Sequence, residues 1–488
     1  MIQKAFLSAL AFLLVQAAHS QTLQQKLESV KDSVTISASN KYGDPSFFKR
    51  LFLGKNYRNV WAQPVRLPVF HLKQLGFTVD KLGGGQQTKS LRLRDPEGRE
   101  WALRTIDKDV EGALPKWLQN TIAEKVTQDM VSAAHPYAPL TINVLAPAAN
   151  ITTAKAYFFA VPDDPDFGAH RALFANTVCM LEDRNPTPDK SETENTENVV
   201  EDLLEKAKYR IAGEEVLRAR LLDILIADWD RHQDQWRWGK KEESASTTYY
   251  AIPRDRDQAY FYSNGLLVKI AQLVALKHMV GFTHTTRRIK SLSAKSWEFD
   301  KVFLNELTKQ DWERITRRFQ ASLTDDVIRR AVRNMPAEVY NLSGATLESK
   351  LIDRRNTLLD DALDYYEFLS EDVTITGSDE PERFHITGNK DSLLVTVFTK
   401  NKEGQLLYQR TFIPDDTKSI NLVALGGDDE IFVAPGADAR IKLIIDGGKG
   451  NNVVNLQSKI RHKIYHSDLD AKAYEVVLKE RLKIKEDE

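Results

Sequence analysis

Acidic and aromatic side chains are concentrated between Leu225 and Trp238, in the segment LIADWDRHQDQWRW that follows an apolar helical pattern. The side chains with chemical potential are Asp228, Asp230, His232 and Asp234. Carboxylates and an imidazole at this spacing can bind a metal ion or take up a proton, and the neighbouring tryptophans can anchor the loop. The alternative is a helix end whose charges only face water.

A second acidic cluster follows closely, in the segment PRDRDQAY from Pro253 to Tyr260. Its carboxylates are Asp255 and Asp257, and arginines alternate with them. Two neighbouring acidic segments favour a site over a solvated surface. The alternative is that Arg254 and Arg256 pair with these acids at the surface.

A glycine-rich segment, GGGQQT from Gly83 to Thr88, precedes two alternating stretches. Glycines let a backbone approach phosphate groups closely, although a glycine triplet alone is more often a turn. The stretches Ser90–Arg94 and Trp101–Ile106 are joined by a Pro-Glu-Gly turn and predict a β-hairpin. Arg104 in the second stretch, and Lys108 just after it, are candidate phosphate-binding cations.

The composition is that of a soluble globular protein of two or three domains: 488 residues, 42% hydrophobic and 28% charged. The net charge of -1 provides no overall field for nucleic acid, so a nucleic-acid partner is not expected. The single cysteine, Cys179, excludes an intrachain disulfide.

The first residues have the pattern of a secretory signal peptide. Lys4 precedes an apolar run from Ala5 to Ala18, and the small residue Ser20 follows. We expect cleavage after Ser20 and a periplasmic or secreted mature chain with no transmembrane segment. The alternative is a buried N-terminal helix.

The remaining pattern predicts an α+β protein in successive parts. A helix is expected at 115–134, and the strands after residue 371 are short and separated by Gly, Asp and Asn turns. The expected parts are a signal peptide (1–20), an N-terminal extension (21–60), a β-rich lobe (61–182), a flexible acidic linker (183–198), a helical lobe (199–370), a small all-β, β-sandwich-like domain (371–470) and a charged tail (471–488).

The order of these motifs resembles that of atypical protein kinases of the HipA, CotH and secretory-pathway types. Trp101-Ala-Leu-Arg104 is similar to the Val-Ala-Ile-Lys strand of kinases, with arginine in place of lysine. Asp230-Arg231-His232 is similar to the Asp-Arg-His catalytic loop of the atypical members. Gln235 stands where a metal-binding asparagine is expected.

This resemblance implies a kinase-like bilobal fold, a β-rich N-lobe and a helical C-lobe, that binds ATP or another nucleotide with Mg or Mn. Asp230 would orient the acceptor hydroxyl, within a motif that includes His232. Asp257, or else Asp255, would hold the metal together with Gln235 or Asp234. The implied nucleotide-binding residues are Gly83, Gly84, Gly85, Gln86, Thr88, Arg104, Lys108 and Glu124, with Asp129 as the alternative to Glu124.

The implied function is transfer of phosphate, or another nucleotide-derived group, to a hydroxyl of a protein, glycan or small molecule outside the cytoplasm. Alternatively, the protein could be a pseudokinase, which binds a nucleotide but does not transfer phosphate. One alternative is a metal-dependent phosphoesterase with Asp228, Asp230, His232, Asp234 and Asp257 as ligands. Another is a non-enzymatic protein whose β-domain binds an envelope component or a glycan.

Overall fold

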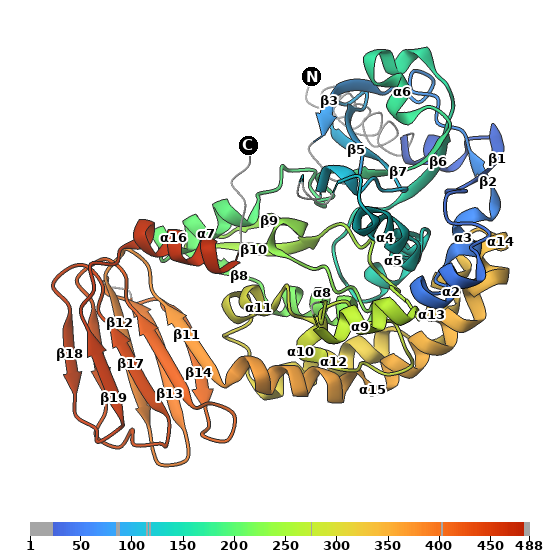
Figure 1. Cartoon of the computed structure of the whole chain (residues 1–488). Helices are drawn as coiled ribbons and strands as arrows, with labels where there is room; N and C mark the ends of the chain where they lie inside the picture. Colours follow the sequence, from blue (N-terminus) through green and yellow to red (C-terminus); the bar gives the residue numbers. More distant parts are fainter. Residues whose placement is uncertain are drawn as a thin grey trace, which may run out of the picture.

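The structure, a computed structural model, describes residues 23–83, 88–113, 116, 119–274, 276–401 and 404–482. The expected signal peptide and Gly84, Gly85 and Gln86 therefore lie outside the described residues. The chain is a mixed α/β protein with several separate sheets (Figure 1).

A five-stranded antiparallel sheet forms the first part of the chain, with the strand order β3-β4-β5-β7-β6. The predicted hairpin is present, and Ser90 pairs with Arg104 across it. Leu91, Leu93 and Leu103 are buried in an apolar cluster on one face of this sheet. The strands are β3 (Thr78–Gly83), β4 (Ser90–Arg94), β5 (Glu100–Thr105), β6 (Tyr157–Val161) and β7 (Thr177–Asp183).

Short helices and one small sheet surround these strands. β1 (Ser33–Ser37) and β2 (Pro64–Pro68) pair antiparallel, and α2 (Phe47–Leu53) and α3 (Arg58–Ala62) lie between them in the chain. α4 (Ile122–Met130) is shorter than the helix predicted at 115–134. It begins after Thr121, whose hydroxyl caps the amide of Glu124, and Val131–Ala133 tightens into a 3-10 turn.

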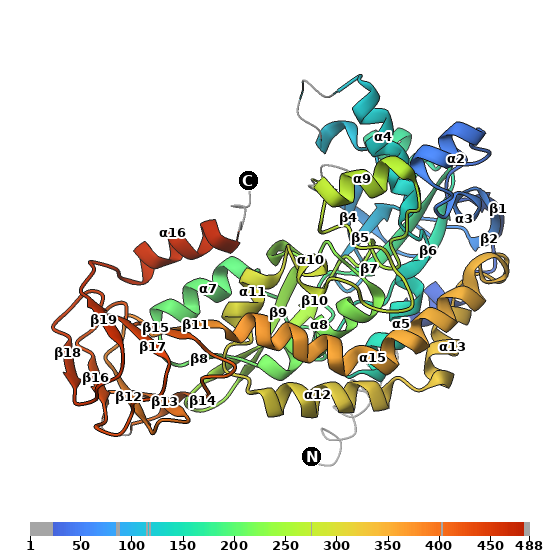
Figure 2. The same cartoon turned by 60° about the horizontal axis from the view of Figure 1, so that its bottom comes forward.

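Helices dominate the middle of the chain. Nearly every residue of α8 from Val216 to Ile226 is buried, because other elements cover it on several sides. α15, the long orange helix in Figure 2, packs against both α8 and α12. The longer helices here are α5 (Ala138–Ala148), α7 (Thr196–Glu205), α8 (Gly213–Ile226), α9 (Leu266–Val274), α12 (Lys309–Ser322), α13 (Asp325–Arg333) and α15 (Ala345–Ser370), with shorter α10 (Ile289–Leu292), α11 (Trp297–Phe303) and α14 (Ala337–Val339).

The segment expected to be a flexible acidic linker is instead anchored. Thr187, Thr193 and Thr196 are buried, and α7 begins at Thr196. The backbone of Glu194 exchanges hydrogen bonds of 2.8 and 3.0 Å with that of Trp238. Hydroxyl and backbone hydrogen bonds hold this loop in place, and the low apolar content of the segment does not reveal them.

A three-stranded sheet joins the helices to the site. β10 (Thr247–Pro253) pairs antiparallel with β9 (Trp236–Glu242) and parallel with β8 (Tyr209–Ile211). The two acidic segments of the sequence lie at the ends of these strands: the first directly precedes β9 and the second directly follows β10.

The carboxyl-terminal strands, predicted to form a β-sandwich-like domain, form two sheets with largely parallel pairing. One sheet has the order β11-β15-β17-β19 and the other β14-β13-β12-β16-β18. All pairs of the first sheet, and β12-β16 and β16-β18, are parallel. The chain alternates between the sheets from β15 to β19, as in a β-solenoid. The strands are β11 (Asp372–Thr376), β12 (Glu382–Gly388), β13 (Leu393–Thr399), β14 (Leu406–Phe412), β15 (Ser419–Val423), β16 (Glu430–Val433), β17 (Lys442–Asp446), β18 (Val453–Leu456) and β19 (His462–Tyr465).

The glycine-rich turns of this solenoid stack on one another. The amide of Asp429 donates to Oδ1 of Asn452 at 2.8 Å, and the amide of Asn451 donates to Oδ1 of Asp428 at 2.8 Å. Side-chain oxygens of one turn thus accept hydrogen bonds from backbone amides of the neighbouring turn.

The last helix ties the solenoid to the helical part. α16 (Ala471–Leu482) packs against α7, and Tyr474 and Leu478 are buried in the same apolar cluster as α8 (Figure 1). Lys479 forms an ion pair with Glu197 of α7. Within the described residues, no helix combines the length and apolar character needed to cross a membrane.

Candidate functional site

The first acidic segment forms the turn between α8 and β9. Ala227 ends α8 in the left-handed conformation, with φ of 54°, and the amide of Asp228 donates back to the carbonyl of Asp223 at 2.9 Å. The tryptophans anchor this loop, as predicted: Trp236 stacks on Phe299 with ring centroids 4.8 Å apart. The loop is thus held at both ends by packed structure.

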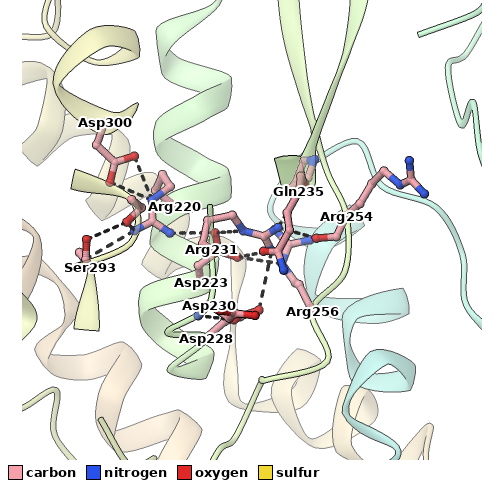
Figure 3. A network of polar contacts seen from close by, with 12 residues as sticks. Arg220, Asp223, Asp228, Asp230, Arg231, Gln235, Arg254, Arg256, Ser293 and Asp300 are labelled. Atoms are coloured by element: carbon pink, nitrogen blue, oxygen red, sulfur yellow. Dashed lines mark hydrogen bonds and ion pairs between the residues drawn. The ribbon is translucent and has the colours of Figure 1, made fainter. Parts of the chain in front are cut away.

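A buried carboxylate, Asp223 of α8, connects the two acidic segments. It accepts hydrogen bonds of 2.9 Å from Nε of Arg231 and from Nε of Arg256, and Nη1 of Arg220 approaches it at 2.9 Å (Figure 3). Burial alone would raise the pKa of Asp223, but these three guanidinium groups lower it below its usual range. Asp223 therefore fixes the loop through Arg231 and the second segment through Arg256.

This network overturns the surface alternative for the second segment. Arg256 is buried and pairs with Asp223, whereas the hypothesis placed it at the surface with Asp255 or Asp257. Because Arg256 pairs with Asp223 of α8, it does not pair with its neighbours Asp255 and Asp257, which contact other groups.

Those partners are the two cations predicted from the β-rich part. Nζ of Lys108 lies 2.5 Å from Oδ2 of Asp257. Nη1 of Arg104 lies 3.9 Å from Oδ2 of Asp255 and 3.9 Å from Oε2 of Glu182. From the sequence, Arg104 and Lys108 were alternative candidates for the phosphate-binding cation. In the structure Arg104 lies near Asp255 and Lys108 near Asp257.

The charged groups of this cluster shift one another's pKa values. Burial, and then the charge of Asp255, raises the pKa of Asp257 to about 6 although Lys108 opposes the shift. Burial would also raise the pKa of Asp255, but Arg104 and Lys108 lower it. Asp255 also has a left-handed backbone, with φ of 53°. Such strain in a non-glycine residue is frequent at functional sites.

Asp230 is paired with a lysine that sequence reasoning did not identify. Nζ of Lys295 forms an ion pair with Oδ1 of Asp230 and lies 4.9 Å from the centroid of the Trp229 ring. The amide of Asp230 donates to Oδ1 of Asp228 at 3.2 Å. Asp230 also raises the pKa of Lys108, so the loop and the Lys108–Asp257 pair are electrostatically coupled.

Two oxygens in the loop are buried and have no hydrogen-bond partner within the described part of the chain: Oδ2 of Asp228 and Oε1 of Gln235. Burial raises the pKa of Asp228 to about 7, and Asp223, Asp230 and Asp257 add to the rise against the opposing charge of Arg231. His232 is half-buried and Asp234 is exposed, with Nδ1 of His232 3.4 Å from Oδ2 of Asp234.

A cavity of about 150 Å³ adjoins the charged cluster. Arg104, Lys108, Asp255 and Asp257 line it together with Thr88. Much of the remaining wall is apolar and includes Met130, Val131, Pro139, Met180, Phe261 and Met279, and the polar side chains Thr105, Thr127, His135 and Gln258 also line it. A mixed apolar and charged lining of this kind suits a ligand with a flat apolar part and a charged part.

No protein-family model and no curated protein matches the chain. Two solved structures resemble it at 10% sequence identity. The Helicobacter pylori proinflammatory kinase CtkA matches over 56% of this chain and 94% of its own, with a TM-score of 0.30. The Rio2 kinase-ADP/Mg²⁺-phosphoaspartate complex from Chaetomium thermophilum matches over 61% and 83%, with a TM-score of 0.27. Both are kinases.

Glu124, the predicted acidic partner of the cations, does not lie in the cluster. The carboxylate of Glu124 accepts a hydrogen bond from the amide of Asn120, and its alternative, Asp129, is buried against Arg58 with Lys49 at 2.7 Å. Glu182 of β7 takes the position near Arg104 instead. The prediction failed because it assumed that the helix carboxylate nearest in sequence would face the strand.

Two residues of the predicted glycine-rich segment are described. Gly83 ends β3 and pairs with Ser90 of β4, and Thr88, like Lys108, lines the cavity.

Within the described residues, no group of three or more His, Cys, Asp or Glu side chains could hold a metal ion. The phosphoesterase hypothesis relied on such a group, and no other observation in this part of the chain favours it.

Proposed function

We propose that the chain is an extracytoplasmic, kinase-like phosphotransferase that moves phosphate, or another nucleotide-derived group, from a metal-bound nucleotide to a hydroxyl. The observation that carries this proposal is the position of Asp223. It holds the Asp230 loop and the Asp255–Asp257 segment together, and that segment contacts Arg104 and Lys108 from the β-rich part. Phosphoryl transfer needs such a meeting of an orienting aspartate, metal-binding carboxylates and phosphate-binding cations.

Asp230 is the residue that would accept the hydroxyl proton. Its backbone is tied to Asp228, and its loop is fixed through Arg231, so its carboxylate is positioned by buried structure. Lys295 keeps a positive charge beside it. The ammonium group of a lysine next to the orienting aspartate can also stabilise the negative charge of a transferring phosphoryl group.

The residues present suit Mg²⁺ or Mn²⁺ together with a nucleotide. These ions prefer oxygen ligands, and Mg²⁺ commonly uses one or two carboxylates with the phosphates of the substrate. Asp257 and Asp255 would supply the carboxylates, and the unpartnered amide oxygen of Gln235, or else Asp234, a further ligand. A metal ion held by these carboxylates would neutralise phosphate charge. It would also replace Arg104 and Lys108 as the partner of Asp255 and Asp257, so that both cations could contact phosphate oxygens.

The cavity supports nucleotide as the donor class. Its volume of about 150 Å³ is smaller than the roughly 300–1,000 Å³ of a pocket for a drug-sized ligand, so it would hold one flat ring system. Its apolar wall and its charged side would then separate a base from its phosphates. The acceptor hydroxyl, on a protein, glycan or small molecule, would approach Asp230.

The N-terminal signal pattern supports a location outside the cytoplasm. A β-rich part with Arg104 and Lys108 and a helical part with Asp230 support a bilobal arrangement. Arginine at position 104 and glutamine at position 235 depart from the kinase pattern. A pseudokinase would keep nucleotide binding and lack transfer, so binding and transfer must be measured separately.

Thermal shift of the mature chain, residues 21–488, with ATP and Mg²⁺ or Mn²⁺ tests the binding step. We expect stabilisation that Asp257→Asn abolishes and that Asp163→Asn, at an exposed ion pair with Arg171, preserves. Asp230→Asn should keep this stabilisation and lose transfer of radiolabelled phosphate. The absence of any nucleotide effect on the wild-type protein would contradict the proposal.

A further inference from the structure

α2 and α9 lie side by side in the structure (Figure 2). Both helices expose several large apolar side chains. Phe48 of α2 is 69% exposed and Leu273 of α9 is 69% exposed. The exposed apolar residues of this surface, here called the α2–α9 surface, are Phe47, Phe48, Leu51 and Phe52 on α2 and Leu266, Leu267, Ile270, Leu273 and Val274 on α9.

On each helix these residues form one stripe. Positions 47, 48, 51 and 52 share a face of α2, and positions 266, 267, 270, 273 and 274 share a face of α9. Val268, on the opposite side of α9, is buried. Single exposed apolar residues are ordinary, but large sets on contacting elements mark interaction surfaces.

The two helices are joined by close backbone contacts. A Cβ added at Gly54 would lie 2.8 Å from the amide nitrogen of Gly265, so glycine permits this approach. The amide of Lys55 donates to Oδ1 of Asn264 at 2.8 Å, and the hydroxyl of Ser263 donates to the carbonyl of Leu53. These contacts hold the two helices together, so the two apolar stripes form one continuous surface.

The two chain segments that form this surface carry cations and no acid, and exposed Asp44 lies just before the first of them. The sequence has no Asp or Glu at 45–64 or at 258–297. Arg50, Lys55, Lys269 and Lys277 are exposed beside the stripes. The nearby acid Asp129 is neutralised by Arg58 and Lys49.

We propose that the α2–α9 surface binds an anionic lipid bilayer. Amphipathic helices with aromatic and aliphatic residues on one face and Lys or Arg beside them lie in the interface, with the apolar face among the acyl chains and the cations at phosphate groups. This inference does not rest on the proposed activity.

Bilayer binding would also orient the candidate site. The chain runs from the end of α9 at Val274 to Met279, which lines the cavity next to Asp255 and Asp257. The cavity would therefore lie near the lipid headgroups.

Co-sedimentation of the mature chain, residues 21–488, with vesicles tests this inference. We expect binding to vesicles of phosphatidylcholine mixed with phosphatidylglycerol, weaker binding to phosphatidylcholine alone, and a decline with added salt. Phe48→Glu combined with Leu273→Glu should lower the partition coefficient at least about tenfold. Val453→Glu combined with Val476→Glu, at residues 58% and 68% exposed on β18 and α16, is the matched control and should bind as the wild type does.

Three results would overturn the proposal. The first is no vesicle binding by the wild-type protein, and the second is equal binding by the Phe48/Leu273 variant. The third is a wild-type dimer in light scattering that the same variant converts to monomer, with no vesicle binding, because a second copy would then occupy the surface. Circular dichroism confirms that both variants fold.

Discussion

The carboxylate of Asp223 and the guanidinium of Arg231 form a fully buried ion pair, with Nε of Arg231 2.9 Å from Oδ2 of Asp223. Arg231 stands in the middle of the acidic loop and Asp223 lies on α8, so this pair fixes the loop to the helix before it. The same carboxylate binds Arg256, and the orientation of both acidic segments depends on it.

Asp223→Asn should therefore destabilise the protein strongly. Removing one partner of a buried ion pair leaves uncompensated charge and typically costs about 3–5 kcal/mol. Asp163→Asn, at an exposed pair with Arg171, should change the free energy of unfolding little. Urea unfolding measures both, and equal midpoints for the two variants would show that the network does not fix the loop.

Local sequence patterns predicted the elements better than their arrangement. The hairpin at Ser90–Thr105, the helix α8 and the strand segments from β13 to β17 follow from periodicity and turn residues. The parallel order of the solenoid does not, because Ile420 pairs with Val373 on one side and Leu443 on the other. Such pairings between distant segments leave no local pattern.

The candidate site divides in the same way. Asp230, Asp255, Asp257, Arg104 and Lys108 stand out by residue type and motif order, and the structure brings the last four together. Glu182 and Lys295 were missed because each lies far in sequence from its partner, and neither sits in a motif. The helix acid Glu124 was chosen by proximity in sequence, which does not determine the direction of its side chain.

The raised pKa of Asp228 predicts a pH-dependent stability. Its folded-state pKa of about 7 lies above the ordinary value of about 3.9, so the folded protein holds a proton that the unfolded chain has lost between these values. Stability from this group is present below about pH 4 and falls as pH rises to about 7.

Asp228→Asn removes this titration. The stability of the variant relative to wild type should therefore rise between pH 4 and 7, by up to about 4 kcal/mol. Urea unfolding across this range measures the difference. Asp326→Asn, at a 78% exposed side chain on α13, should show no such trend. A constant difference between Asp228→Asn and wild type would mean that Asp228 is ionised throughout.

The Asp230–Lys295 pair predicts a rate effect without a binding effect. Lys295→Met should lower phosphate transfer about 10- to 1,000-fold if the ammonium stabilises the transferring group, as loss of one charge-stabilising donor does elsewhere. The affinity for nucleotide should change little, because the phosphate-binding cations Arg104 and Lys108 remain. Single-turnover rates and nucleotide titration separate the two. Lys290→Met, on α10, is the control, and a loss of nucleotide binding in Lys295→Met alone would assign Lys295 to the phosphate site instead.

The stacked turns of the solenoid predict a large effect of one methyl group. Gly450 has φ of 110°, and an added Cβ would overlap the carbonyl oxygen of Gly427 in the neighbouring turn. Gly450→Ala should therefore combine backbone strain with a steric clash and cost more than about 2 kcal/mol. Gly98, with φ of 80°, has open space around its added Cβ, so Gly98→Ala should cost only the backbone strain, about 1 kcal/mol. Hydrogen exchange in β16 and β18 would report the loss, because these strands flank the two turns. Unchanged protection there in Gly450→Ala would contradict the parallel stacking, since turns of an antiparallel sandwich need not approach each other so closely.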